Sequence, residues 1–301
     1  MHEGEIVGHM SLFFLRIKVG NQIIMGSQAS DLVIHPDFRR QGMFLAIGRA
    51  MMKEAYEKRV WVTYGFPDPP AYHGHLQYGW FDVSMIPVMV SYSDIYEATK
   101  GKLGKFKPID PIYSKLSKMV DKFYLMRQRS RKSGIDDLCI REISSFDKRI
   151  DEFWMSIQRN FGIVVIRNSE YLNWRYFQNP DLRYRVFMAD DGKVQGFIVV
   201  AVEASKDRRI GYLLDIFSSS RNVLLRLLET GIGYLNSQTV DSIKCLMLKD
   251  YEGYKVLKEK GFTPFLHAKL RLCARVNSSH FFESYGATRK WYVTYGDCDF
   301  I

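Results

Sequence analysis

The sequence of 301 residues lacks the marks of several protein classes. Its four cysteines are scattered singly with no CxxC spacing, which argues against a zinc site and against a disulfide framework. We therefore expect reduced, mostly buried thiols. No leader peptide opens the chain, and no apolar run reaches the roughly 18 residues that a membrane helix needs. These absences predict a cytoplasmic protein without a membrane span.

A net excess of positive charge is also scarce outside one segment. The chain has a net charge of +10, and residues 100–133 hold eight lysines and three arginines against two aspartates, a net charge of +9. Apolar residues recur at helical spacing within this segment, so it predicts a basic amphipathic linker helix. Because the excess charge is local, a nucleic-acid partner is not expected, while contact of this helix with a membrane surface stays open.

The most informative stretch is Asp31–Ala50, which reads DLVIHPDFRRQGMFLAIGRA. An apolar strand leads through a proline-marked basic loop into an apolar helix that starts after Gly42. Free amide groups and the helix dipole make such a helix start an anion site, and Arg39 and Arg40 add positive charge beside it. The stretch has neither a Walker loop nor GxGxxG spacing. It therefore predicts a phosphate or pyrophosphate site of another kind.

The stretch resembles the acyl-CoA signature of the GCN5-related N-acetyltransferase (GNAT) family, a strand followed by V-x-P-x-x-R/Q-x-x-G-x-G/A and a helix. Phe44 departs from that pattern, which has Gly or Ala there. The resemblance implies that acetyl-CoA is the co-substrate, that its pantetheine lies beside the strand and that its pyrophosphate meets the loop. The implied cofactor-binding residues are Leu32, Val33, Ile34, Arg39, Arg40, Gln41, Gly42, Met43 and Phe44.

The rest of the chain predicts a mixed α/β order that occurs twice. Strands are expected at 5–15, 16–28 and 30–35, then helix 43–58, strand 60–64, helix 71–78 and strand 81–91. The same order returns after residue 136, and the final stretch 291–300 is expected to form the last strand of the second sheet. We divide the chain into an N-terminal GNAT domain (1–92), a basic linker (93–135) and a C-terminal GNAT-like domain (136–301).

The two copies differ in what each has lost. The first lacks the strand and two helices that open the family's fold and wall its acceptor pocket, so either the start is truncated or another part of the chain supplies that wall. The second has Ser218–Asn222 at its helix start, without the proline, the arginine or the glycine, and is expected to bind acetyl-CoA poorly. Tandem pairs with one degenerate copy resemble Eis-like enzymes.

Family usage implies direct attack of a neutral amine on the thioester, with a proton donor for the thiolate and a base for the amine. The family's donor tyrosine position holds His75 here, and Tyr72 and Tyr78 are neighbours that could substitute. Asp31 is the candidate base, although a cap or an ion pair is an equally good interpretation. Adjacent His73 and His75 lack a third ligand, so no metal is expected.

The sequence thus predicts an acetyl-CoA-dependent N-acetyltransferase acting on a primary amine, in a small molecule or a peptide. Two alternatives stay open. One is a non-catalytic binding module that retains a vestigial CoA loop. The other is an aminoacyl transferase of tandem GNAT-like fold, against which the retained CoA loop argues. The sequence does not identify the acceptor or the oligomeric state.

Overall fold

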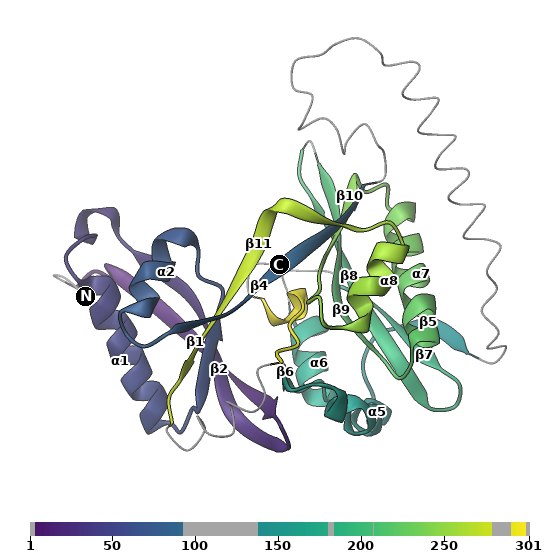
Figure 1. Ribbon diagram of the computed structural model, residues 1–301, viewed down its shortest axis with the longest axis horizontal. Helices are drawn as coiled ribbons and strands as arrows, with labels where there is room; N and C mark the ends of the chain where they lie inside the picture. Colours follow the sequence, from purple (N-terminus) through teal and green to yellow (C-terminus); the bar gives the residue numbers. More distant parts are fainter. Residues whose placement is uncertain (1–3, 93–137, 180–183, 207, 279–289, 299–301) are drawn as a thin grey trace, which may run out of the picture. The chain divides into compact units, whose positions relative to one another are not determined.

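The computed structural model describes residues 4–92, 138–179, 184–206, 208–278 and 290–298 (Figure 1). They form two compact units that interleave along the chain. Unit 1 comprises Met1–Val88, Trp154–Tyr171 and Leu266–Ile301, and unit 2 comprises Met89–Phe153 and Leu172–Phe265. The basic helix predicted in the linker lies outside the described residues. The three sequence-based domain boundaries stay a prediction.

Unit 1 begins with a long antiparallel hairpin of β1 (Gly8–Val19) and β2 (Gln22–Ile34). Gly20 turns the chain between them with a φ of +57°, a conformation that glycine adopts readily. The separate strand predicted at 30–35 is wrong. The pairing runs on to Ile34 through an irregularity near Ser11, where Asp31 takes a left-handed φ of +54°, so one bent strand replaces two.

The next elements confirm the predicted order: η1 (Pro36–Phe38), α1 (Met43–Glu57), β3 (Val62–Gly65), α2 (Pro69–Leu76) and β4 (Phe81–Tyr92). α1 buries one face against the hairpin and also contacts α2 (Figure 1). α2 starts two residues earlier than predicted because the Asp68 carboxylate caps it, accepting from the amide of Ala71 at 2.9 Å. Proline is tolerated in that first turn, where amides have no helical partner.

Two strands from distant parts of the chain complete the sheet of unit 1. β11 (Thr263–Val276) pairs antiparallel with β3, and β6 (Ile163–Val165) pairs antiparallel with β1. The strand order within this unit is β4-β11-β3-β2-β1-β6. β2 and β3 are parallel neighbours, as the family resemblance requires.

The predicted last strand at 291–300 is wrong in position and in type. In the described part, Trp291 makes a single bridge to Ile163, and a 3-10 turn, η3 (Tyr295–Asp297), follows. Thr294 and Asp297 cap this turn reciprocally, which ends any extended run. The segment belongs to unit 1 rather than to the second sheet.

This C-terminal segment and residues 154–171 belong to unit 1. Tyr64 of β3 is fully buried, its ring lies 5.7 Å from that of Trp291, and its hydroxyl donates to the carbonyl of Asp297 at 3.4 Å. Another part of the chain covers this face of β3.

The strands of unit 2 follow one another in the order β5-β7-β8-β9-β10. Its strands are β5 (Cys139–Ile143), β7 (Arg185–Asp190), β8 (Val194–Ala204), β9 (Arg209–Ser218) and β10 (Ser242–Leu246), and α7 (Arg221–Ser237) packs on β7, β8 and β9. α8 (Glu252–Glu259) precedes β11. α5 (Arg149–Ile157), η2 (Gln158–Asn160) and α6 (Ser169–Tyr176) complete the described elements.

The order β9-α7-β10-α8-β11 repeats the order β2-α1-β3-α2-β4. In each set the first and second strands are parallel. Each long helix ends two residues before a left-handed, non-glycine residue, Arg59 in unit 1 and Thr239 in unit 2. Each short helix is followed by a glycine of positive φ, Gly79 and Gly261. The predicted mixed α/β class with flanking helices is confirmed.

Candidate functional site

The first turn of α1 presents an anion site. Gly42 is its N-cap, with a φ of +80° and no side-chain hydrogen bond to the helix amides. Glycine is the residue that adopts this conformation without strain, and it leaves the amides of the first turn open. Together with the helix dipole, these amides attract negative charge.

The loop before α1 is held by its own side chains. The Arg39 guanidinium donates through Nε to the carbonyl of Ile34 at 3.1 Å, and Gln41 Nε2 donates to the carbonyl of Asp37 at 3.0 Å. Arg40 is exposed, has a left-handed φ of +63° and has no partner among the described residues. Arg39 and Gln41 therefore shape the loop, and Arg40 is the cation left for a ligand.

The corresponding helix start in unit 2 is closed to an anion. β9 reaches α7 through two residues, and the Ser220 hydroxyl accepts from the amide of Val223 at 3.4 Å. Arg221 pairs with both Glu252 and Glu259. The serine cap and the paired arginine leave this helix start without the open amides and the free cation found at α1.

Beside the loop, β2 offers a free strand edge. The register between β2 and β3 runs from Gly26↔Val62 to Gln28↔Tyr64, while β2 continues to Ile34. Within the described residues, no strand pairs with the β3-facing edge of β2 beyond Gln28. An extended ligand could add there as a strand does, through backbone hydrogen bonds to Leu32–Ile34.

His75 lies at the buried centre of an aromatic cluster. It is 6% exposed, and its ring centroid lies 4.7 Å from Trp80 and 5.2 Å from Phe44. Its Nδ1 lies 2.9 Å from the carbonyl of Ala71, and a carbonyl can only accept, so Nδ1 carries a proton. Burial lowers the pKa of His75 and so favours the neutral ring. In that form Nε2 accepts a proton rather than donates one.

The two neighbouring tyrosines differ in what their hydroxyls do. The Tyr72 hydroxyl donates to Asp82, and the Arg271 guanidinium lies 3.9 Å from the Tyr72 ring while pairing with Asp82 at 2.7 Å. The hydrogen bond to Asp82 raises the pKa of Tyr72. The Tyr78 hydroxyl is buried without a partner among the described residues, and burial raises its pKa. Its proton is therefore not committed elsewhere.

Asp31 lies on β2, where the chain bends. Its carboxylate is exposed and accepts a hydrogen bond from the Ser11 hydroxyl at 2.8 Å. The structure thus brings His75, Tyr78 and Phe44 together, ties Tyr72 to Asp82 and leaves Asp31 in solvent. The catalytic role of each stays a prediction.

Phe44, which departs from the family pattern, points at α2. A Cβ on Gly74 would lie 2.3 Å from the Phe44 ring, so the glycine makes room for the ring. The ring also packs edge-on against His75. Because the aromatic side chain is accommodated between the two helices, its bulk does not fill the loop before α1.

Comparison with known proteins bears on this arrangement. Residues 1–81 match the family model described as an acetyltransferase (GNAT) domain. The fold is that of the GNAT acyltransferases. No curated protein matches the sequence.

Solved acyltransferases share this fold over most of the chain. A GCN5-related N-acetyltransferase of Anabaena variabilis is 14% identical with a TM-score of 0.59, over 89% of this chain and 59% of its own. Yeast N-myristoyltransferase with bound myristoyl-CoA is 13% identical with a TM-score of 0.59, over 90% and 67%. A probable N-acyltransferase of Enterococcus faecalis is 12% identical with a TM-score of 0.58, over 91% and 59%. The chain thus spans about three fifths of two of these proteins.

The GNAT-domain site also uses residues that the sequence reasoning missed. Gly48 of α1 lies under the Tyr78 ring, where a Cβ would be 2.6 Å away, and Gly74 lies under Phe44. Trp80 Nε1 is buried with no partner among the described residues. Glycines inside helices are a signal of close packing that could have indicated the first two.

Two further absences concern the described residues. They contain no group of three or more histidine, cysteine or acidic side chains placed to hold a metal. None of their helices is long and apolar enough to cross a membrane. None of the four cysteines is joined in a disulfide, and three are buried, with Cys139 exposed.

We expect the stability of the GNAT domain to fall at low pH through His75. Because burial lowers its folded pKa, the unfolded chain binds this proton more readily. Its contribution is therefore full above the ordinary pKa of about 6.5 and is lost as the pH falls below it. His75→Gln should therefore reduce the loss of stability between pH 7 and pH 5, measured by urea unfolding. Identical pH profiles for the two proteins would contradict this assignment.

The contact of Phe44 with Gly74 predicts a second result. Gly74→Ala should lower the free energy of unfolding by about 1–3 kcal/mol, because the new methyl group meets an aromatic ring that cannot yield. The same change should cost little in a Phe44→Ala background. Gly233→Ala in α7 is the matched control, since nothing lies within 4 Å of its added Cβ, and it should stabilise by about 0.5–1 kcal/mol. Equal effects of Gly74→Ala in both backgrounds would contradict the contact.

Proposed function

We propose that the protein is an N-acetyltransferase that transfers the acetyl group of acetyl-CoA to a primary amine, with its donor site in unit 1. The observation that carries the proposal is the open helix start at Gly42 beside the free edge of β2. The pyrophosphate would lie on the amides of the first turn of α1, with Arg40 beside it. The pantetheine would extend along Leu32–Ile34 toward β3.

We assign the protonation of the leaving thiolate to Tyr78. Its hydroxyl has an uncommitted proton and lies in the same cluster as His75. The Nε2 of neutral His75 would accept a proton, so this ring suits the removal of the amine proton better than the donor role implied by the family position. Tyr72 would hold α2 in place through Asp82, and exposed Asp31 would act only through water.

The two sets of repeated elements support a tandem arrangement in which the second copy has lost its donor site. Ser220 caps the helix that would otherwise hold the phosphates. In place of the missing opening elements, residues 154–171 and 291–298 would wall the acceptor side of β3. An amine-bearing small molecule or peptide would enter there, and we place the reaction in the cytoplasm.

Calorimetric titration with acetyl-CoA and with CoA tests the donor site, and thiol release over a panel of small amines, amino sugars and peptides tests the chemistry. Longer acyl-CoA donors belong in the same panel, because an N-myristoyltransferase shares the fold. No heat with either nucleotide would overturn the proposal. CoA binding without thiol release from any donor and amine would instead favour a non-catalytic module.

A further inference from the structure

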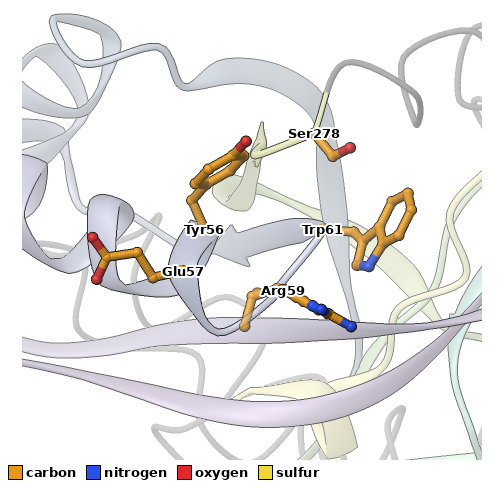
Figure 2. A pocket seen from close by; sticks show the side chains of 6 residues that line it. Tyr56, Glu57, Arg59, Trp61 and Ser278 are labelled. Carbon is orange, nitrogen blue, oxygen red and sulfur yellow. The ribbon is translucent and has the colours of Figure 1, made fainter.

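A pocket opens at the C-terminal end of α1, the end opposite to Gly42. Its volume is about 360 Å³, and it is lined by Tyr56, Glu57, Arg59, Val60, Trp61 and Ser278 (Figure 2). This volume is at the lower end of the range for small-molecule sites. It suits a ligand of one or two rings.

The walls of the pocket are aromatic. Tyr56 is 65% exposed and Trp61 is half-buried, and Figure 2 shows them on two sides of the hollow. Flat aromatic faces of this kind favour planar ligands by stacking.

The pocket also holds a free cation. Arg59 is exposed, and its guanidinium has no hydrogen-bond or ion-pair partner among the described residues. In Figure 2 its side chain runs toward Trp61, while the Glu57 carboxylate points away from both. Glu57 lies 3.9 Å from Lys53 instead. The guanidinium is therefore the charged group on the Trp61 side of the pocket.

Arg59 occupies a backbone position that favours glycine. It follows the helix cap with a φ of +57°, its amide donates to the carbonyl of Tyr56 at 2.9 Å, and the amide of Val60 donates to that of Ala55 at 2.8 Å. This is the hydrogen-bond pattern that usually ends a helix with glycine. A side chain kept there at the expense of strain is a reason to look for a ligand.

The repeated turn in unit 2 shows what the same backbone looks like without a binding site. Thr239 takes the left-handed position with a φ of +51°, and Asp241 stands where Trp61 stands in unit 1. The Asp241 carboxylate accepts from the amide of Arg209 at 2.7 Å, and Arg209 Nε donates to the carbonyl of Gln238 at 3.1 Å. In unit 2 the hydrogen bonds of Asp241 and Arg209 occupy the turn, whereas in unit 1 the guanidinium of Arg59 and the indole of Trp61 line a pocket.

We propose that this pocket binds a small aromatic anion, a planar ring system that carries a carboxylate or a phosphate. The rings of Tyr56 and Trp61 would flank the planar part of the ligand. The Arg59 guanidinium would donate hydrogen bonds to its carboxylate or phosphate. The site is separate from the acyl-CoA site, since the two lie at opposite ends of α1.

Titration of the full chain with 2-naphthoate tests the proposal by calorimetry. We expect saturable binding that is at least about tenfold weaker for the neutral analogue 2-naphthalenemethanol, because a charge-assisted hydrogen bond is lost. Saturating CoA should leave the affinity for 2-naphthoate unchanged. Absence of saturable binding, equal affinity for the neutral analogue, or competition by CoA would each overturn the proposal.

Arg59→Gly separates binding from folding, because it should weaken 2-naphthoate binding at least about tenfold while raising the melting temperature by about 2 °C. Thr239→Gly is the matched control, since it relieves the same strain in unit 2 and should leave binding unchanged. Tyr56→Ala, a change of an exposed side chain, should weaken binding severalfold. Wild-type affinity in Arg59→Gly would overturn the assignment of the guanidinium.

Discussion

Replacing Gly42 with glutamate is expected to weaken the binding of acetyl-CoA and CoA by at least about a hundredfold, nearly 3 kcal/mol. Gly42 has a φ of +80°, which any residue with a Cβ adopts only under strain. A glutamate there would also set a carboxylate beside the helix amides that the pyrophosphate is proposed to use. The backbone strain and the added negative charge both weaken the binding of CoA, and calorimetric titration measures their combined effect.

Two controls separate charge from strain. Gly42→Ala keeps the strain without the charge, and it should lose about tenfold or less. Gly20→Glu places the same residue at another glycine of positive φ, in the turn between β1 and β2, where nothing lies within 4 Å of the added Cβ. It should leave CoA affinity unchanged. If Gly42→Glu and the wild type bind CoA with equal affinity, the loop is not part of the donor site.

Removing the charge of Arg167 is expected to lower the free energy of unfolding by about 3–5 kcal/mol. Arg167 and Asp297 are both almost fully buried, and Nη2 donates to the carboxylate at 2.7 Å. A second donation, from Nη1 to the carbonyl of Val165, is 3.0 Å long. Arg167→Met leaves Asp297 as a buried charge without its cation, which is the costly state.

The double variant Arg167→Met with Asp297→Leu tests whether the cost comes from the stranded charge. It should recover part of the stability, because the stranded charge is gone while the buried Thr294 amide loses its acceptor. Arg185→Met is the exposed control. Arg185 pairs with Glu142 at the same 2.7 Å, but both side chains are about half exposed, so its loss should cost about 1 kcal/mol or less. Urea unfolding of the wild type, the two single variants and the double variant measures these free energies. Similar losses of stability for Arg167→Met and Arg185→Met would contradict the prediction.

The sequence was most informative where structure is local. The loop from His35 to Gly42, the helix after it and the Gly20-Asn21 turn all follow from residues that are neighbours in the chain. Proline, glycine and apolar periodicity report such elements directly. The predicted break between strands 5–15 and 16–28 is wrong, because residues 16–19 continue β1. Pairing with β1 joins residues 22–28 to 30–34 in β2, which composition alone does not report.

The rest depended on partners far away in the chain. β6 is three residues long and pairs with Ile17–Val19, so no pattern within it could indicate its place. The stretch after Trp291 is rich in β-forming residues and predicted a strand, but Thr294 and Asp297 close a turn there. Within the site, the neutral form of His75 and the fit of Phe44 against Gly74 depend on packing between α1 and α2. Neither could be read from spacing.

The place of β11 between β3 and β4 has a consequence for the order of events on the ribosome. Cys273–Val276 pair with β3, about two hundred residues earlier in the chain. At a synthesis rate of roughly 5–20 residues per second, β3 waits roughly 10–40 s for this partner after it emerges. Unit 1, which carries the loop before α1, is the first unit to be started and the last to be completed. A nascent chain that stops before β11 therefore leaves β3 with an open edge, which is a template for aggregation.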